Sequence, residues 1–468
     1  MTALVWFRCD LRIGDNPALQ AAVDSGRPVI AVYIHQPDAD WAYGGASRVW
    51  LHESLRNLRE SLLNYGIPMM FKVGNPEREL PTLCRALEIS DLYWNREYDP
   101  NAKQESATIK SNLKGVECHS YNARLLVEPF NFANKSGEPY RVFTPFWKEV
   151  YRAAHGFSAR DIDAKWHQSS PEIPSSSLED LALLSGHAWE AKIRSHWQIG
   201  EEAALRAVDA FSDANIYGYE EGRNFPAETA TSRLSPHLHF GEISVRVLWQ
   251  QLRQRVNSDG KAGGEDAVIA WLRQLAWREF AHHLLYHFPQ TVAQPLNEKF
   301  ARMDWSAAPE LLRKWQLGQT GYPLVDAGMR ELWETGWMHN RVRMVVASFL
   351  TKHLGCHWIE GAKWFWDTLV DADLANNTLG WQWVAGCGAD AAPYYRISNP
   401  YLQSQKFDER GAYIRRWIPA LTKVPDKQLH APLSGDLLTE TAVAYPAACV
   451  DHAVARQAAL DRYTAIKS

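Results

Sequence analysis

The sequence lacks several features that mark common protein classes. No run of about 18 apolar residues occurs in its 468 residues, so we expect no transmembrane helix and no membrane partner. Its six cysteines include no C-x-x-C pair, which argues against zinc spacings and a disulfide framework and indicates a reducing, cytoplasmic environment. Lys and Arg number 50 against 54 for Asp and Glu, so nucleic acid could be bound only through a local basic patch.

The usual motifs of nucleotide-binding and hydrolytic enzymes are also missing. There is no G-x-G-x-x-G, because Gly44-Gly45 does not directly follow a predicted strand. Gly260-Lys261 lacks the earlier glycine of a P-loop, and no G-x-S-x-G elbow occurs. His283 and His287 have the spacing of a metal clamp, but no Glu follows the first and no third ligand stands nearby. We therefore predict no metal site.

Strand-like and helix-like segments alternate over the first 125 residues. Short segments rich in Val, Ile and aromatic residues predict strands at 4–7, 29–34, 68–73, 92–94 and 116–120. Helices are predicted between them at 16–24, 46–65, 76–87 and 101–113. This alternation is typical of a doubly wound parallel sheet, so we predict an α/β domain over residues 1–125.

The rest of the chain follows a different pattern. Residues 126–200 predict an interdomain linker, with Pro, Ser and Gly concentrated around 169–177. From residue 201 the apolar spacing is helical, most clearly between Val268 and Leu284. Further helices are predicted at 322–334, 338–353, 361–369 and 449–467. The predicted fold class is therefore α/β plus all-α, with a large helical domain over 201–468.

Tryptophan is unusually abundant, with 21 residues against 16 Phe and 18 Tyr. Nine of the tryptophans lie between 305 and 383, among Asn, Arg and Asp residues. Core packing explains most of these indoles. Asn340, Arg343 and Met344, however, are spaced to share one helix face. An amide, a guanidinium and a thioether beside indole walls are suited to a flat polar ring.

Several motifs occur in order along nearly the whole chain. They are VWFRCDLR at 5–12, Y-x-x-x-R at 219–223, TSRLS at 231–235, WREF at 277–280, TGYPLVDAGM at 320–329, GWMHNRVRM at 336–344, DADLANNTLGWQW at 371–383 and PYYR at 393–396. Together they closely resemble the photolyase/cryptochrome family, and within it the bacterial cyclobutane pyrimidine dimer photolyases of class I or class III. The resemblance implies an antenna-binding N-terminal domain and a helical domain that binds FAD and carries out catalysis.

In that family the helical domain holds a U-shaped FAD. The matching positions are Tyr219, Thr231, Ser232, Leu234, Ser235, Trp271, Arg278, Asn340, Arg343, Asp371, Asp373 and Asn377. A hydroxyl-rich segment opening a helix at 231–235 would supply anion-binding donors without a Gly-rich loop, and a simple helix cap is the alternative. Asn377 matches the residue that faces flavin N5, where Asn favours a repair enzyme over a light receptor.

The resemblance also implies a pocket for a pyrimidine dimer flipped out of UV-damaged DNA. Trp277 and Trp383 match its aromatic walls, and the other matching positions are Arg223, Gln274, Arg341 and Met344. The family usually has Glu at the position of Gln274. An amide can still donate to the pyrimidine but cannot transfer a proton, so we expect retained binding and a lower repair efficiency. The two His of (6-4) photolyases are absent, which disfavours that substrate.

Two further features follow from the resemblance. Trp381, Trp358 and Trp305 match the chain that carries electrons from the surface to FAD, with separate packing roles as the alternative. The N-terminal domain is expected to hold an antenna chromophore, either methenyltetrahydrofolate or 8-hydroxy-5-deazaflavin. Ala102 replaces an acidic residue that binds folate in one subgroup, so the choice stays open.

Three functions are compatible with these residues. The first is light-driven DNA repair by a carbon–carbon lyase, the second a cryptochrome-like photoreceptor, and the third FAD binding without a role for light. Little sequence remains after Trp417, which favours the enzyme, and the third function leaves Trp277 and Trp383 unexplained. We expect DNA to dock near residues 396–416, which carry five positive and two negative charges, and we expect a monomer.

Overall fold

The computed structural model describes residues 2–154, 159–174, 176–260, 264–306, 308–391, 395–431 and 445–467. Lys261 and, from the last motif, Pro393 and Tyr394 lie outside these ranges. The chain forms two compact units. The first comprises Met1–Tyr217, Ser232–Pro289 and Val370–Ala375, and the second comprises Gly218–Thr231, Gln290–Leu369 and Asn376–Ser468. The domain limits at 125 and 200 stay a prediction.

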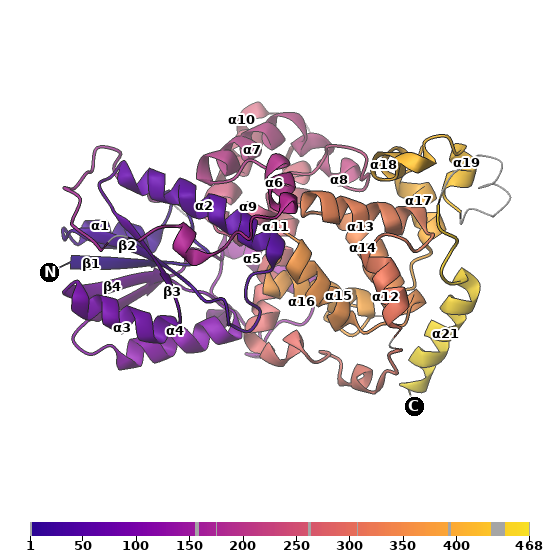
Figure 1. Cartoon of the computed structure of the whole chain (residues 1–468), viewed down its shortest axis with the longest axis horizontal. Coiled ribbons are helices and arrows are strands. Elements are labelled where there is room, and N and C mark those ends of the chain that lie inside the picture. Colours follow the sequence, from indigo (N-terminus) through magenta and orange to yellow (C-terminus); the bar gives the residue numbers. More distant parts are fainter. Residues whose placement is uncertain are drawn as a thin grey trace. The chain divides into compact units, whose positions relative to one another are not determined.

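The first unit contains a parallel five-stranded sheet with the order β3-β2-β1-β4-β5 (Figure 1). Its strands are β1 (Thr2–Phe7), β2 (Val29–His35), β3 (Met69–Val73), β4 (Ile89–Asn95) and β5 (Glu117–Tyr121). Leu4 of β1 pairs in register with Ile30 and with Leu92. The order reverses at β1, as in a doubly wound sheet, so the predicted fold class is confirmed.

Helices cover both faces of this sheet because alternate residues of each strand point to opposite sides. Val5 and Phe7 pack with α1 (Pro17–Asp24) and α2 (Gly45–Leu63). Leu4 and Trp6 pack with α3 (Pro76–Ala86) and α4 (Pro100–Asn112). Asn-Pro pairs begin two of these helices: Asn16 and Asn75 cap α1 and α3, each followed by Pro at the first helical position.

The segment predicted as a linker contains a helix that the sequence pattern did not reveal. This is α5 (Phe143–Ala153), whose residues Phe143, Phe146 and Val150 are buried, and it packs against α11 (Gly264–His287). A second short helix, α6 (Ala188–Ser195), follows. Helix α5 has only 11 residues and contains Pro145, so its periodicity was too short to stand out.

The remaining helices of the first unit include the one with the clearest apolar spacing. They are α7 (Glu201–Ala214), α9 (Ser235–His239), α10 (Val245–Asp259) and α11. Val268, Leu272, Leu275 and Phe280 of α11 are all buried, as predicted. Gly241, with φ of +68°, follows α9; a Cβ there would lie 2.1 Å from the carbonyl oxygen of Cys9. Only glycine fits this close approach.

The second unit is helical. Its elements are α8 (Tyr219–Gly222), α12 (Pro309–Gln316), α13 (Pro323–Thr335), α14 (Asn340–Ser348), α15 (Trp358–Thr368), α16 (Leu374–Ala385, whose first two residues belong to the first unit), α17 (Pro400–Phe407), α18 (Ala412–Trp417), α19 (Asp426–Leu429) and α21 (His452–Ala465). The predicted helix at 338–353 is instead α14 followed by a π-helical turn at Phe349–His353. Within the described ranges, no helix is long and apolar enough to cross a membrane.

Candidate functional site

The predicted site residues divide between the two units. The first unit contains Ser232, Leu234, Ser235, Trp271, Gln274, Trp277, Arg278, Asp371 and Asp373. The second contains Arg223, Tyr219, Thr231, Trp305, Asn340, Arg341, Arg343, Met344, Trp358, Asn377, Trp381 and Trp383. The contacts of these residues are therefore described separately for each unit.

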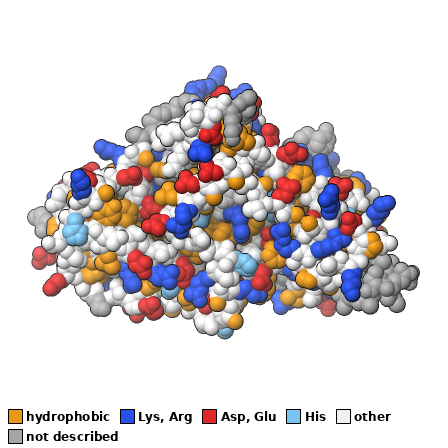
Figure 2. Space-filling model, turned by 90° about the horizontal axis from the view of Figure 1, so that it is seen from above, with side chains coloured by type: hydrophobic (Ala, Val, Ile, Leu, Met, Phe, Trp, Pro, Cys, Tyr) orange, Lys and Arg blue, Asp and Glu red, His pale blue; other side chains and the backbone are white. Residues whose placement is uncertain are grey.

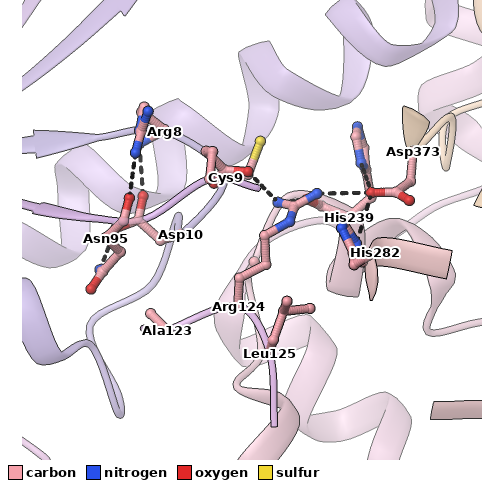
Figure 3. Close-up of polar contacts among 12 residues, drawn as sticks. Arg8, Cys9, Asp10, Asn95, Ala123, Arg124, Leu125, His239, His282 and Asp373 are labelled. Atoms are coloured by element: carbon pink, nitrogen blue, oxygen red, sulfur yellow. Dashed lines mark hydrogen bonds and ion pairs between the residues drawn. The ribbon is translucent and has the colours of Figure 1, made fainter. Parts of the chain in front are cut away.

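Asp373 lies at the centre of a buried polar cluster in the first unit (Figure 3). Arg124 donates to its Oδ2 over 2.8 Å, with His282 Nε2 at 3.4 Å and His239 Nδ1 at 3.8 Å from the same oxygen. The other arm of Arg124 pairs with Glu97 at 3.2 Å. One guanidinium thus joins a residue just after β4 to a residue just before α16.

Burial and these partners shift several pKa values. Despite the cost of burial, His282, His239 and Arg124 hold the pKa of Asp373 well below its usual range. Burial lowers the pKa of His282 to about 4, so this imidazole is neutral near pH 7. Burial raises the pKa of Asp99 and of Glu279 to about 7. Asp373 is therefore a fixed anion, and its charge acts on Asp99, which titrates near neutrality.

The hydroxyl-rich segment at 231–235 leads into α9. The Ser235 hydroxyl donates to Asp371 Oδ2 over 2.6 Å, and Leu234 is fully buried. Arg233, between the predicted residues, has φ of +52° and places its guanidinium 4.2 Å from the ring centre of Trp197. A left-handed non-glycine residue is uncommon, and such strain often marks functional segments.

Helix α11 presents four predicted residues at helical spacing. Trp271 is buried, while Gln274 and Trp277 are half-buried. The Trp277 indole stacks on Phe143 of α5, with ring centres 3.7 Å apart and planes 7° from parallel. Gln274 Nε2 donates within its own helix to the Ala270 carbonyl over 3.3 Å. Stacking on Phe143 therefore holds the Trp277 ring in a fixed orientation.

Arg278, the fourth of these residues, is buried and donates to backbone oxygens. Its Nη1 lies 2.9 Å from the Arg124 carbonyl and its Nη2 lies 3.5 Å from the Leu238 carbonyl. Burial and the neighbouring Arg124 lower its pKa. These contacts join α11, α9 and the segment after β5 within the first unit.

In the second unit, α14 carries a group of polar side chains. His339 caps the helix by accepting from the Arg341 N–H over 3.2 Å. Arg341 donates to Asn224, lies 4.4 Å above the Phe407 ring and is 4.0 Å from Met344 Sδ. Burial and the nearby positive charge of Arg223 lower the pKa of Arg341. Two predicted lesion residues, Arg341 and Met344, are thus neighbours.

Other predicted residues of this unit have separate contacts. The Arg223 guanidinium lies 5.6 Å from the Tyr219 ring centre, and that of Arg396 lies 5.8 Å from Trp383. Arg343 Nε donates to the Met338 carbonyl over 2.7 Å. Asn340 is exposed at the start of α14, and Thr231 is half-buried.

The predicted electron chain lies on α15 and α16 and on the segment before α12. Trp381 is buried and lies edge-on to Phe365, with ring centres 4.9 Å apart. Trp358 is buried beside His357, which in turn lies edge-on to the half-buried Trp305 at 5.1 Å. Asn377, one turn before Trp381, donates to the Ala362 carbonyl over 3.0 Å.

A glycine makes room for the first of these indoles. At Gly361 of α15, a Cβ would lie 2.0 Å from the Trp381 ring. The ring therefore packs directly on the backbone of α15, and its position depends on this glycine.

One ring nitrogen of each histidine in the pair at 283 and 287 contacts a backbone group. His283 Nε2 accepts from the Tyr140 N–H over 3.0 Å, and His287 Nε2 lies 3.0 Å from the Pro129 carbonyl. Asp91, Glu117 and His119 form a metal-like group in the described residues. Arg27 already pairs with Asp91 at 3.1 Å, so the structure gives this group an internal cation.

Sequence reasoning missed Arg124, His239, His282 and Phe143. Arg124 and Glu97 closely follow β5 and β4, at the carboxyl edge of a parallel sheet, where functional residues concentrate. The position of Arg124 just after a predicted strand could therefore have marked it as a candidate. No sequence pattern marks His239, His282 or Phe143, because their contacts depend on packing between distant segments.

Two family models match the chain: "DNA photolyase" over residues 3–166 and "FAD binding domain of DNA photolyase" over residues 271–465. The deoxyribodipyrimidine photo-lyase of Agrobacterium fabrum is 43% identical over 99% of this chain and 98% of its own length. This chain belongs to the photolyase/cryptochrome family. The predicted family is thus confirmed, and with it FAD as the cofactor.

Structural neighbours agree with this assignment. The crystal structure of a bacterial class III photolyase from Agrobacterium tumefaciens has a TM-score of 0.94 and 43% identity, covering 100% of this chain and 98% of that one. A Synechocystis cryptochrome has a TM-score of 0.89 and 28% identity, with 98% of each chain covered. Cryptochrome-1 of Arabidopsis thaliana is 35% identical over 92% of this chain, which spans 64% of the plant protein.

Proposed function

We propose that this protein is a light-driven DNA repair enzyme that splits cyclobutane pyrimidine dimers. When bound, reduced FAD excited by blue or near-UV light supplies the electron that opens the cyclobutane ring. The proposal rests on near full-length similarity to photolyases, combined with one structural feature: the Trp277 indole is held flat on Phe143 while remaining half-exposed. A rigid aromatic surface is suited to packing against a flipped pyrimidine dimer.

The chemistry of the donor set fits FAD. In the first unit, the proposed residues are Ser232, Leu234, Ser235, Trp271, Arg278, Asp371 and Asp373; in the second, they are Tyr219, Thr231, Asn340, Arg343 and Asn377. Hydroxyls and guanidinium groups suit a pyrophosphate, and carboxylates and amides suit the N–H and carbonyl groups of a flavin ring. Asp371 already accepts from Ser235, which fixes its orientation.

The proposed lesion residues have complementary tasks. Trp277 and Trp383 provide flat walls, Arg223 and Arg341 provide positive charge, and Met344 fills the space beside Arg341. Gln274 is the proposed donor to the pyrimidine. Its Nε2 has two hydrogens and uses one contact within α11, so a second donation is available.

Trp381, Trp358 and Trp305 are the proposed path for electrons that return FAD to its reduced state. Phe365 lies beside Trp381, and His357 lies between Trp358 and Trp305, so each of the three indoles has an aromatic neighbour. Trp305 is the half-buried end, which suits exchange with a soluble reductant.

A cryptochrome-like signalling role is the second candidate. The similarity to cryptochromes of Arabidopsis and Synechocystis favours it, as does Gln274 in place of the usual Glu. We also propose a cytoplasmic monomer with an antenna chromophore, methenyltetrahydrofolate or 8-hydroxy-5-deazaflavin. All six cysteines are free, which suits a reducing compartment.

The deciding experiment is a repair assay on an oligonucleotide that contains one dimer. Purified protein with reduced FAD should repair it under blue light and leave it unchanged in the dark. Trp277→Ala should weaken dimer binding by about 1–3 kcal/mol, the usual contribution of one stacked base. The exposed Trp333, replaced by Ala, is the matched control and should have no effect. Normal FAD binding without repair in the light would refute the enzyme and leave the signalling role.

A further inference from the structure

We propose that Arg124, assisted by His282 and His239, is a positioning group that holds Asp373 in place and balances its negative charge, and that it thereby sets the reduction potential of bound FAD. The inference depends on the proposed function, because Asp373 is there proposed to contact FAD. Arg124 itself lies outside the motifs that carry the family resemblance.

The geometry of Arg124 is that of a shared guanidinium fork. One arm reaches Asp373 Oδ2 at 2.8 Å and the other reaches Glu97 Oε2 at 3.2 Å. The side chains of Arg124 and Asp373 are only 4% and 6% exposed, so water screens this pair little. A planar fork can serve two carboxylates at once, which a lysine ammonium does less well.

Several contacts fix the position of this fork within the first unit. The Arg124 carbonyl accepts a hydrogen bond from Arg278. The Nη1 of Arg124 donates to the His239 carbonyl over 3.2 Å. Two residues later, the Leu126 N–H donates to Glu279 over 2.8 Å. Arg124 therefore has little freedom to move away if Asp373 changes its charge.

His282 contacts Asp373 without adding charge. His282 has a pKa of about 4 and is neutral near pH 7, so its ring can donate to Asp373 but cannot balance it. Arg124, by contrast, is a permanent cation in direct contact with Asp373. The other titratable groups that act on this cluster are Glu97, Asp99, Arg278, Glu279 and Cys9, whose thiol stays neutral because burial raises its pKa to about 12.

Loss of the Arg124 charge should therefore act on the flavin through Asp373. An uncompensated carboxylate disfavours adding an electron nearby, so the potential should fall. One charge at ~10 Å in an effective dielectric of ~20 changes the reduction equilibrium by roughly tenfold. Working at about pH 8.5 keeps Asp99 and Glu279, whose pKa values are about 7, ionised throughout.

The test is a spectroelectrochemical measurement of the FAD midpoint potential in five proteins: wild type, Arg124→Met, Arg124→Lys, Asp373→Asn and the double variant Arg124→Met/Asp373→Asn. Arg124→Met should lower the equilibrium constant for one-electron reduction of FAD roughly tenfold, which corresponds to a midpoint potential lower by about 59 mV. Asp373→Asn should raise it. The double variant should lie near wild type, because both charges of the pair are gone. Arg124→Lys should restore much of the wild-type potential.

Arg96→Met is the matched control, because Arg96 pairs with Glu128 at 2.6 Å in the same unit. It should leave the potential unchanged. Should Arg124→Met fail to retain FAD, the double variant compared with Asp373→Asn decides: the double variant should have the lower potential, near that of wild type, and equal potentials would overturn the inference. A wild-type potential in folded Arg124→Met, or equal shifts in Arg124→Met and Arg96→Met, would overturn the inference.

The same samples separate this inference from the proposed function. Wild-type protein without FAD or without repair in the light would refute the function. Wild-type protein with both, together with an unchanged potential in Arg124→Met, would refute only the role of Arg124.

Discussion

Arginines in the two units illustrate opposite ways of placing positive charge. In the first unit, buried Arg124 has a carboxylate on each side of its fork. In the second, Arg341 has Asn224, Phe407 and Met344 as neighbours, and in the described residues no carboxylate pairs with it or with Arg223. Burial and Arg223 even lower the Arg341 pKa.

The difference suggests two roles: Arg124 stabilises the folded structure, whereas Arg341 and Arg223 are available to bind an anionic or polar ligand. A compensated, buried ion pair is costly to break but has little attraction left for an outside anion. Two neighbouring guanidinium groups without an acidic partner repel each other, and an incoming phosphate or carbonyl relieves that repulsion. The second arrangement suits DNA, and the first suits a fixed electrostatic environment for a cofactor.

The largest expected effect is on stability, from removing the compensated charge. Arg124→Met leaves two buried carboxylates without their cation, so the free energy of unfolding should fall by about 3–5 kcal/mol. Arg341→Met should cost about 1 kcal/mol or less, because it leaves no buried charge behind. Denaturant unfolding of both variants, with FAD present at equal concentration, measures this contrast. Equal losses would mean that Arg124 is not a structural ion pair.

The second prediction concerns pH and the carboxyls around Asp373. Burial raises the pKa of Glu279 from 4.5 to about 7, so folding favours its protonated form. The protonated Glu279 contributes about 3 kcal/mol to the free energy of unfolding. This contribution is fully present below about pH 4.5 and is lost as the pH rises through 7. Glu279→Gln should remove that loss. Unfolding of wild type and variant between pH 4.5 and 8 gives the difference curve, and a flat curve would contradict the prediction.

Sequence reasoning recovered the fold better than the electrostatics, for a physical reason. The five strands and their helices follow local periodicity, which a sequence displays directly. Helix α5 was missed because one proline and three turns give too little pattern. The motifs supplied candidate residues such as Asn377 and Trp277. The partners of Asp373 could not be inferred, because Arg124, His239 and His282 meet only when segments 249 residues apart fold together.

The third prediction addresses the uncompensated charges near α17 and α18. Lys406 and Arg410 are exposed, whereas Arg415 pairs with Asp426 at 2.6 Å and Arg416 donates to the Ala227 carbonyl. The predicted basic patch is therefore partly neutralised, and Figure 2 shows acidic and basic side chains interspersed on the face in view. Lys406 and Arg410 are the members best able to contact phosphates.

Reversing Lys406 and Arg410 to Glu should weaken damaged and undamaged DNA alike, by about 1 kcal/mol or more per charge. The slope of log affinity against log salt should become shallower by about 0.9 for each phosphate that the variant no longer neutralises. Fluorescence anisotropy across a salt series measures both quantities. Arg85→Glu on α3, also exposed, is the control and should change neither. A weakening confined to damaged DNA would place these residues in the lesion pocket instead.

The smallest expected effect on binding comes from replacing a neutral amide of the first unit by a carboxylic acid. Gln274 is half-buried, and its Nε2 is engaged with its own helix at Ala270. Gln274→Glu, if protonated in the pocket, keeps one donor to the pyrimidine, so dimer affinity should change by less than about 1 kcal/mol. The acid can also transfer a proton, so repair per absorbed photon should rise. Quantum yield and dimer affinity, measured in parallel, separate the two effects.

Gln316→Glu on α12, the same substitution outside the predicted pocket, is the control. An unchanged yield would mean that the amide already serves repair fully, and a large affinity change would remove Gln274 from its proposed place beside the pyrimidine.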